Sequence, residues 1–204
     1  MTSLRIFKEQ LRSIKRWLAI ALLLFIAGAV MGATMNVFQD YGQSQTAGIK
    51  ELAEQINAQE HARFILFVFI FLNNAIKSVI VMFTGLLFGI IPTIFLFING
   101  LVMGYIFGMA ADQGADVGRL FLRGILPHGI IELPVMIVSG AIGLNLGALM
   151  WKRMWNWRGI NRSDKKKSVR AYLRDLVPVA WILVALLLIA AVIESTITFW
   201  LLER

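Results

Sequence analysis

Long apolar runs dominate the chain and alternate with short polar stretches. No charged residue occurs within Leu18–Met35, Phe64–Leu72, Val79–Ala111 or Val177–Ile193. About 20 apolar residues suffice for a helix to cross the hydrocarbon core of a bilayer. The strict alternation of membrane strands is absent, so helices are the expected spanning elements. The pattern therefore predicts an all-α, polytopic membrane protein.

The apolar runs predict about five membrane helices. Their expected bounds are Trp17–Val37, Ala62–Val81, Leu86–Ala111, Pro134–Met150 and Leu176–Phe199. Pro92 predicts a kink or a break in the third helix, because proline removes a helical hydrogen bond. Residues 120–151 are too long for one upright helix, and Pro127 and Pro134 divide them. We therefore expect a broken or re-entrant stretch at 120–133 ahead of the fourth helix.

Three polar stretches flank these helices. Residues 1–16 are basic, with apolar positions at helical spacing, which predicts an amphipathic helix on the inner membrane face. Residues 38–61 are more acidic, and they fit either an amphipathic helix on the outer face or a solvated connector. Residues 112–119 predict a small outer loop.

Composition and charge agree with a membrane protein. Of 204 residues, 58% are hydrophobic, the mean hydropathy is +0.74, and there is no cysteine to form a disulfide. The net charge of +8 comes from basic blocks beside the apolar runs, so it indicates topology and not nucleic-acid binding. The Lys165-Lys166-Lys167 run is either such a topology signal or an attraction to anionic membrane lipids.

The two basic blocks define the expected topology. Basic residues gather on the cytoplasmic side of membrane proteins. We expect one membrane domain over 1–204, in the cell (inner) membrane. Its parts are a cytoplasmic start at 1–16, a four-crossing core at 17–151, a basic cytoplasmic loop at 152–175, and the last helix with an outer tail at 176–204.

Small residues recur at helical spacing in the apolar segments. Glycines three or four residues apart let two helix backbones approach closely in lipid. This pattern predicts packing within one subunit, and the alternative is a homodimer interface. The glycines concerned are Gly85, Gly89, Gly100, Gly104, Gly108, Gly140, Gly143 and Gly147.

Polar side chains inside the apolar segments are the candidate functional residues. They are Asn73, Asn74, Lys77, Asn99, His128, Glu132 and Asn145. Such groups are costly in lipid, and they either hold helices together or mark a function. We expect Lys77 near the inner surface. His128 and Glu132 lie about one helical turn apart, so they predict a polar clasp, with a transport, metal or catalytic site as the alternative.

Motifs for catalysis are missing from the sequence. There is no His-Glu-x-x-His, paired aspartate, Gly-x-Ser-x-Gly or phosphate-binding loop. Zinc needs a third protein ligand beyond His128 and Glu132, and the other histidine, His61, lies at the edge of the second helix. We therefore expect neither an enzyme nor a metal or other cofactor.

The order of these motifs resembles the stage II sporulation protein M family of five-helix membrane proteins. The resemblance is carried by Asn73-Asn74, by Asn99-Gly100 with Gly104, by Leu126-Pro127-His128-Gly129 with Glu132, and by Gly140 with Gly143. It implies a non-enzymatic scaffold, similar to the sporulation protein that holds peptidoglycan-degrading proteins during engulfment. Membrane-anchored cell-envelope proteins would then be the partners, docking through their own membrane helices. The alternatives are a small-solute or lipid transporter with a midplane polar site and, after it, an intramembrane metal hydrolase.

Overall fold

The computed structural model describes residues 3–57, 60–157 and 169–198, and every element in these ranges is helical. The α-helices are α1 (Ser3–Ser13), α2 (Lys15–Thr34), α3 (Gln39–Asn57), α4 (Ala62–Thr84), α5 (Ile90–Asp112), α6 (Val117–Arg119), α7 (Leu126–Trp157) and α8 (Val169–Ile193). A short 3₁₀ helix, η1 (Asn36–Phe38), and two π-helices, η2 (Leu120–Ile125) and η3 (Glu194–Thr198), complete the order.

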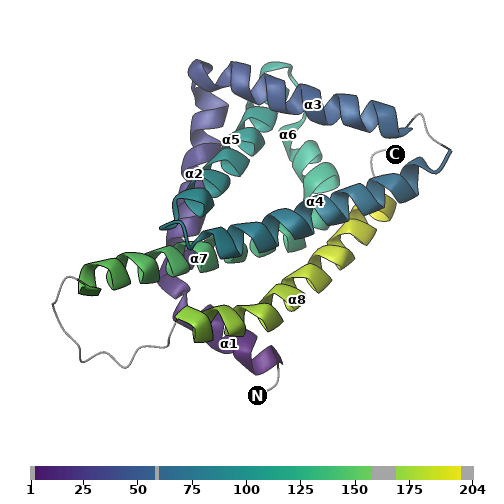
Figure 1. The fold of residues 1–204 in the computed structure, drawn as a ribbon. Helices are drawn as coiled ribbons and strands as arrows, with labels where there is room; N and C mark the ends of the chain where they lie inside the picture. Colours follow the sequence, from purple (N-terminus) through teal and green to yellow (C-terminus); the bar gives the residue numbers. More distant parts are fainter. Residues whose placement is uncertain (1–2, 58–59, 158–168, 199–204) are drawn as a thin grey trace.

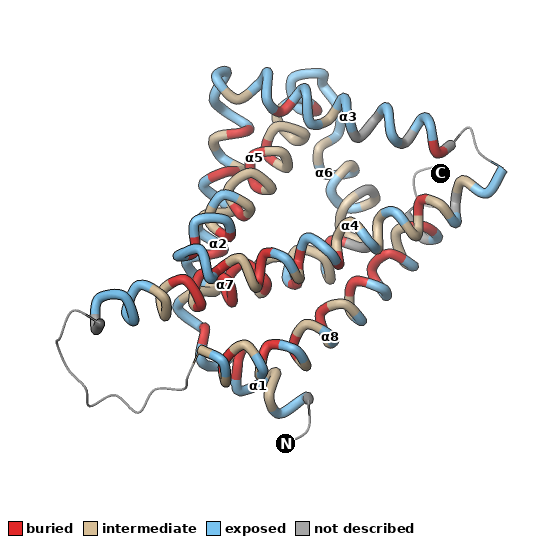
Figure 2. Tube along the Cα trace, in the orientation of Figure 1, coloured by how far each residue is buried: buried red, intermediate tan, exposed pale blue. Residues whose placement is uncertain are grey.

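Five of the described helices are long and apolar enough to cross a membrane. The candidate spans are Lys15–Thr34, Phe64–Thr84, Ile90–Asp112, Gly129–Trp155 and Val169–Thr196. Large apolar side chains are widely exposed along them, as expected where lipid and not water surrounds the protein (Figure 2). The chain is thus an all-helical, multi-pass membrane protein with five spanning helices.

The helices are arranged as two flanks with α3 across one end (Figure 1). On one flank α2 and α5 lie side by side, and on the other α4 and α8 do. α7 contacts α2, α4, α5 and α8, and therefore ties the flanks together. α3 packs against α5 and α4, so the helical alternative for residues 38–61 is the one observed.

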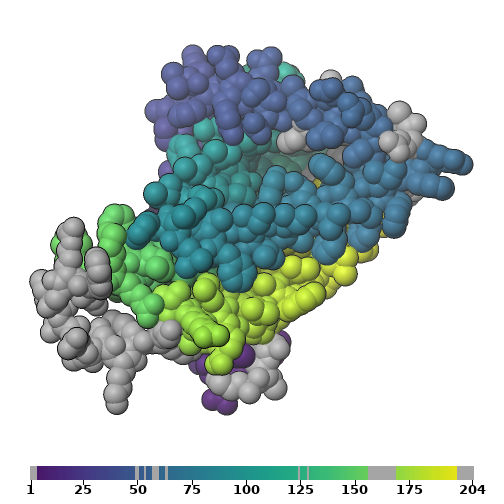
Figure 3. All heavy atoms as spheres, in the orientation of Figure 1, coloured from purple at the N-terminus to yellow at the C-terminus, as the bar shows by residue number. Residues whose placement is uncertain are grey.

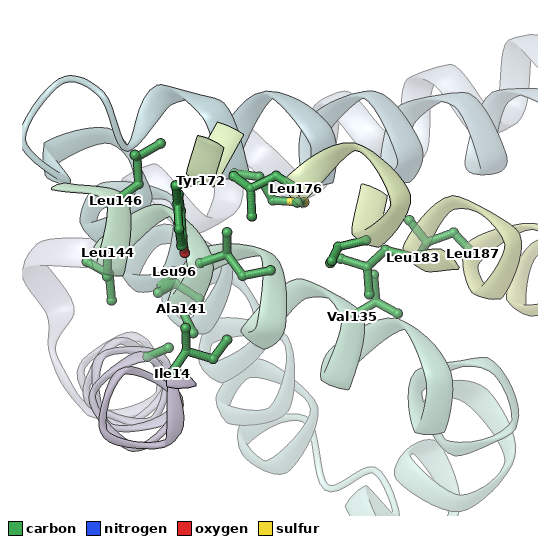
Figure 4. Close-up of a cluster of buried hydrophobic side chains, with 14 of the residues drawn as sticks. Ile14, Leu96, Val135, Ala141, Leu144, Leu146, Tyr172, Leu176, Leu183 and Leu187 are labelled. Atoms are coloured by element: carbon green, nitrogen blue, oxygen red, sulfur yellow. The ribbon is translucent and has the colours of Figure 1, made fainter. Parts of the chain in front are cut away.

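The core lies toward the end that carries α1. Buried apolar side chains from α5, α7 and α8 gather there around Ile14, which is fully buried between α1 and α2 (Figure 4). Ile6, Phe7 and Leu11 of α1 pack against this cluster. The apolar face of the amphipathic N-terminal helix thus rests on protein.

Glycines make the contact between α2 and α5 very close. A Cβ atom added at Gly28 would collide with the Phe97 carbonyl oxygen, and one at Gly104 would collide with the Ala29 carbonyl oxygen. Gly32 and Gly100 meet the opposite backbone in the same way. Because positions along both helices increase together, α2 and α5 run parallel. Gly28 and Gly32 had not been singled out from the sequence.

A second glycine contact joins α4 and the start of α5 to α7. A Cβ atom at Gly85 would meet the backbone of Gly143, and one at Gly147 would meet the backbone of Gly89. Gly89 also caps α5 with φ +78, a conformation that glycine adopts without strain. Gly140 faces the side chain of Leu96, and Gly108 faces Ala33. The predicted glycines in these contacts face other helices of the same chain.

The sequence predicts that proline interrupts two spanning helices, but the structure shows no interruption at either residue. α5 begins at Ile90, so Pro92 lies in its first turn, where the missing N–H has no helical partner to lose; the predicted kink or break at this residue is wrong. α7 continues unbroken through Pro134, whose side chain is exposed, so the predicted helix boundary there is also wrong. The change in this segment comes earlier, where the π-helix η2 leads into α7.

The last helix also differs from its predicted bounds. α8 begins at Val169, seven residues before the expected start, and therefore includes Arg170 and Arg174 of the basic block. α7 extends to Trp157, so the basic connection is shorter than the predicted 152–175 loop. The Lys165-Lys166-Lys167 run lies outside the described residues.

Candidate functional site

A polar cavity lies between the two flanks, at the middle of several membrane spans. Its volume is about 260 Å³, which is room for several water molecules or one small solute. Phe25, Asn74 and Asn99, which line it, lie near the midpoints of the α2, α4 and α5 spans. The complete lining is Phe25, Asn73, Asn74, Lys77, Ser78, Phe95, Asn99, Met103, Glu132, Leu133, Met136 and Leu187.

One strong hydrogen bond crosses from α4 to α7 at this cavity. The Asn74 Nδ2 atom donates to Glu132 Oε1 at 2.6 Å. Three helical turns further along both helices Gly85 meets Gly143, so α4 and α7 run parallel and hold this pair in register. Asn73, one residue before Asn74, donates weakly to Asn74 Oδ1 at 3.5 Å. The structure thus brings Asn73, Asn74 and Glu132 together.

Asn99 reaches the same cavity from α5 but makes its hydrogen bond locally. Its Nδ2 atom donates to the Phe95 carbonyl oxygen, one turn earlier, at 2.7 Å. A backbone carbonyl can only accept, so the amide nitrogen points toward the helix, and Asn99 Oδ1 together with the second N–H of the amide can interact elsewhere. Asn99 therefore contributes an oxygen to the site.

Lys77 lies deeper in the membrane span than predicted. α4 continues to Thr84, seven residues past Lys77, and this side chain lines the cavity together with Glu132. The predicted position near the inner surface assumed that the helix ended at Val81. Opposite charges on α4 and α7 thus face one space within the membrane.

Two of the predicted polar residues lie apart from this group or cannot be placed in it. Asn145 donates to the Tyr172 hydroxyl at 2.8 Å and joins α7 to α8 beside the apolar core. The side chain of His128 lies outside the described part of the structure, although its backbone belongs to α7. The predicted His128–Glu132 clasp therefore stays a prediction.

Two residues near the cavity were not identified from the sequence. Ser78, only 5% exposed, lines it beside Lys77, and a lone serine in an apolar helix gives no clear signal. Glu194, which falls within the expected last helix Leu176–Phe199, begins the π-helix η3, and η3 contacts α7, the helix that carries Glu132. The sequence signal for Glu194 is its position directly after the last apolar run, Val177–Ile193.

The described residues do not form an evident metal centre. Among them, no group of three or more histidine, cysteine, aspartate or glutamate side chains gathers closely enough to hold a metal ion. The polar groups that line the cavity are one ammonium, one carboxyl group, three amides and a hydroxyl, and they can act through hydrogen bonds and charge.

A separate apolar groove runs between α4 and α8. Figure 3 shows the face of the molecule on which these two helices lie side by side. Its volume is about 520 Å³, and its lining is almost entirely apolar. Ile76 on α4 is 53% exposed and Trp181 on α8 is 71% exposed. We call this hollow the α4–α8 groove. Its complete lining is Phe71, Leu72, Ala75, Ile76, Val79, Ile80, Phe83, Val177, Ala180, Trp181 and Val184.

Comparison with known proteins gives one family and two distant relatives. Residues 21–199 match the profile of a family described as stage II sporulation protein M. Two uncharacterized proteins of Methanocaldococcus jannaschii are each 27% identical, one over 54% of this chain and the other over 62%. The matched region spans 47% of the first relative and 68% of the second, so the chain covers about half the length of the first. No solved structure matches the chain.

Proposed function

Because the chain belongs to the stage II sporulation protein M family, we propose that it is a non-enzymatic membrane scaffold that recruits membrane-anchored cell-envelope proteins. It resides in the cell membrane with α1 on the cytoplasmic side, as the basic residues near both α1 and the α7–α8 connection favour. The family resemblance set out above supports the class of function. The α4–α8 groove is the observation that supports recruitment through the membrane.

The shape and chemistry of the groove suit one apolar transmembrane helix of a partner. The α4 wall extends from Phe71 to Phe83, or about 18 Å at the helical rise. Helices in lipid associate by van der Waals packing, which a concave apolar wall increases. The chain's glycine contacts are already used between its own helices. We therefore assign the partner to this groove and not to a glycine contact.

Photo-crosslinking in the membrane tests this proposal. A photoreactive amino acid at Ile76 or Trp181 should crosslink a single-span envelope protein that mass spectrometry identifies, and the crosslink should be reciprocal from that protein's own membrane helix. Leu23 on α2, 65% exposed on another face, is the matched control and should not give this product. Adducts with lipid alone, or with a second copy of this chain, would show that the groove has another occupant.

A further inference from the structure

We propose that the polar cavity binds a small zwitterion, a molecule or head group that carries an ammonium and an anionic group a short distance apart. This proposal rests on different residues from the scaffold proposal and does not depend on it. The cavity itself carries the inference: Lys77 of α4 and Glu132 of α7 both line it, and Asn74, which bonds to Glu132, lies near the midpoint of the α4 span.

The two charges of the cavity face one space without neutralising each other directly. Lys77 and Glu132 both line it, yet among the described residues no ion pair joins them. Leaving separated charges within a membrane is costly unless water or a guest compensates them. A zwitterion supplies both missing charges, with its anion toward Lys77 and its ammonium toward Glu132.

Glu132 and Asn99 both bring hydrogen-bond acceptors to the cavity, the carboxyl oxygens and Asn99 Oδ1. Asn74 and Asn99 use their amide nitrogens on Glu132 and on the Phe95 carbonyl oxygen. Carboxylate and amide oxygens accept hydrogen bonds and cannot donate them. An ammonium group, with its N–H donors, is complementary to these acceptors, and Lys77 supplies donors for an anionic group in the same cavity.

The apolar part of the lining sets the size of the guest. Phe25, Met103 and Met136 border the polar group. A cavity of about 260 Å³ accommodates a small amino acid or the head group of phosphatidylethanolamine. These two sources share the recognised chemistry, and the experiment separates them.

The variants for the test remove charge while preserving contacts. Glu132→Gln keeps an oxygen that accepts from Asn74, so it retains the α4–α7 hydrogen bond, and Lys77→Met keeps the length of the side chain. Tyr172→Phe is the matched control, because it removes an interhelical hydrogen bond of an intramembrane asparagine outside the cavity. Thermal unfolding in detergent checks that all three variants remain folded.

Binding is measured with the full chain in nanodiscs. The nanodiscs contain anionic phosphatidylglycerol. If the bound zwitterion is a free amino acid, radiolabelled glycine and alanine should bind saturably. If it is a lipid head group, short-chain phosphatidylethanolamine should bind instead. Because each variant removes a charge-assisted contact, binding should weaken about tenfold or more in both cavity variants and stay unchanged in Tyr172→Phe. No saturable binding of any of these probes, or equal binding by wild type and both cavity variants, would overturn the proposal.

Discussion

At the scale of single residues, the polar side chains within the membrane have two distinct surroundings. Asn74 and Glu132 face a cavity that also contains a charged lysine. Asn145 and Tyr172 face each other beside tightly packed apolar side chains. Both pairs join two separate helices. The first pair borders a cavity that can hold a small molecule, whereas the second pair joins two helices. Substitutions in the first pair should therefore change ligand binding, and substitutions in the second should change stability.

Tyr172→Phe tests the structural role of the second pair. The phenylalanine keeps the ring in the core but leaves the Asn145 amide without its hydroxyl partner. The free energy of unfolding should fall by about 1 kcal/mol, the usual range for a hydrogen bond between membrane helices. Equilibrium unfolding in mixed micelles measures this change, and an unaltered or increased stability would show that the bond contributes nothing.

At the scale of elements, close backbone contact is what fixes the helices around the cavity. α2 and α5 meet through glycines on both sides, and α7 meets α4 and the start of α5 through another set. Small residues allow this approach, which maximises packing where no hydrophobic effect drives helices together. The cavity is thus bordered by helices whose separation the glycines determine.

Two chemically identical substitutions should change stability in opposite directions. Gly104→Ala places a Cβ atom against the Ala29 carbonyl oxygen, whereas Gly48→Ala on α3 meets no atom within 4 Å. We expect Gly104→Ala to destabilise by about 1–3 kcal/mol through overpacking, and Gly48→Ala to stabilise by up to about 1 kcal/mol through helix propensity. Thermal unfolding of both variants measures the difference, and a Gly104→Ala variant as stable as wild type would contradict the α2–α5 contact.

The elements also show what the sequence could and could not predict. The apolar runs identified all five spanning helices, because length and hydropathy alone set that requirement. The prolines misled, because the effect of Pro92 depends on where the helix begins and that of Pro134 on its exposed position in α7. The partners of Asn74 and Asn145 could not be predicted, because they depend on the register between separate helices.

At the scale of the whole molecule, the two ends of the bundle differ in charge. The end with α1 also carries the start of α8, which contacts α1, and the sequence is rich in lysine and arginine in α1 and around the start of α8 (Figure 1). The opposite end carries α3 and the turn after α5. This asymmetry is the basis for the proposed orientation in the membrane.

Single introduced cysteines can test that orientation without background, since the chain has none. Arg5→Cys and Lys166→Cys should be protected from a membrane-impermeant maleimide in intact cells, because both are expected in the cytoplasm. Gln113→Cys, in the turn after α5, should react. The reverse pattern of labelling would invert the topology, and labelling after lysis provides the control that each cysteine is reactive.

Quantitative co-purification measures whether a membrane-anchored partner is recruited at the α4–α8 groove. The protein is purified in mild detergent as wild type, as Ile76→Trp, which fills the groove, and as Leu23→Trp, which adds the same bulk on α2. We expect an identified envelope protein to co-purify with wild type and with Leu23→Trp in the same molar ratio of partner to chain, and to be lost from Ile76→Trp. Equal recovery of that protein with all three, or a purified chain that carries no partner in any of them, would contradict it.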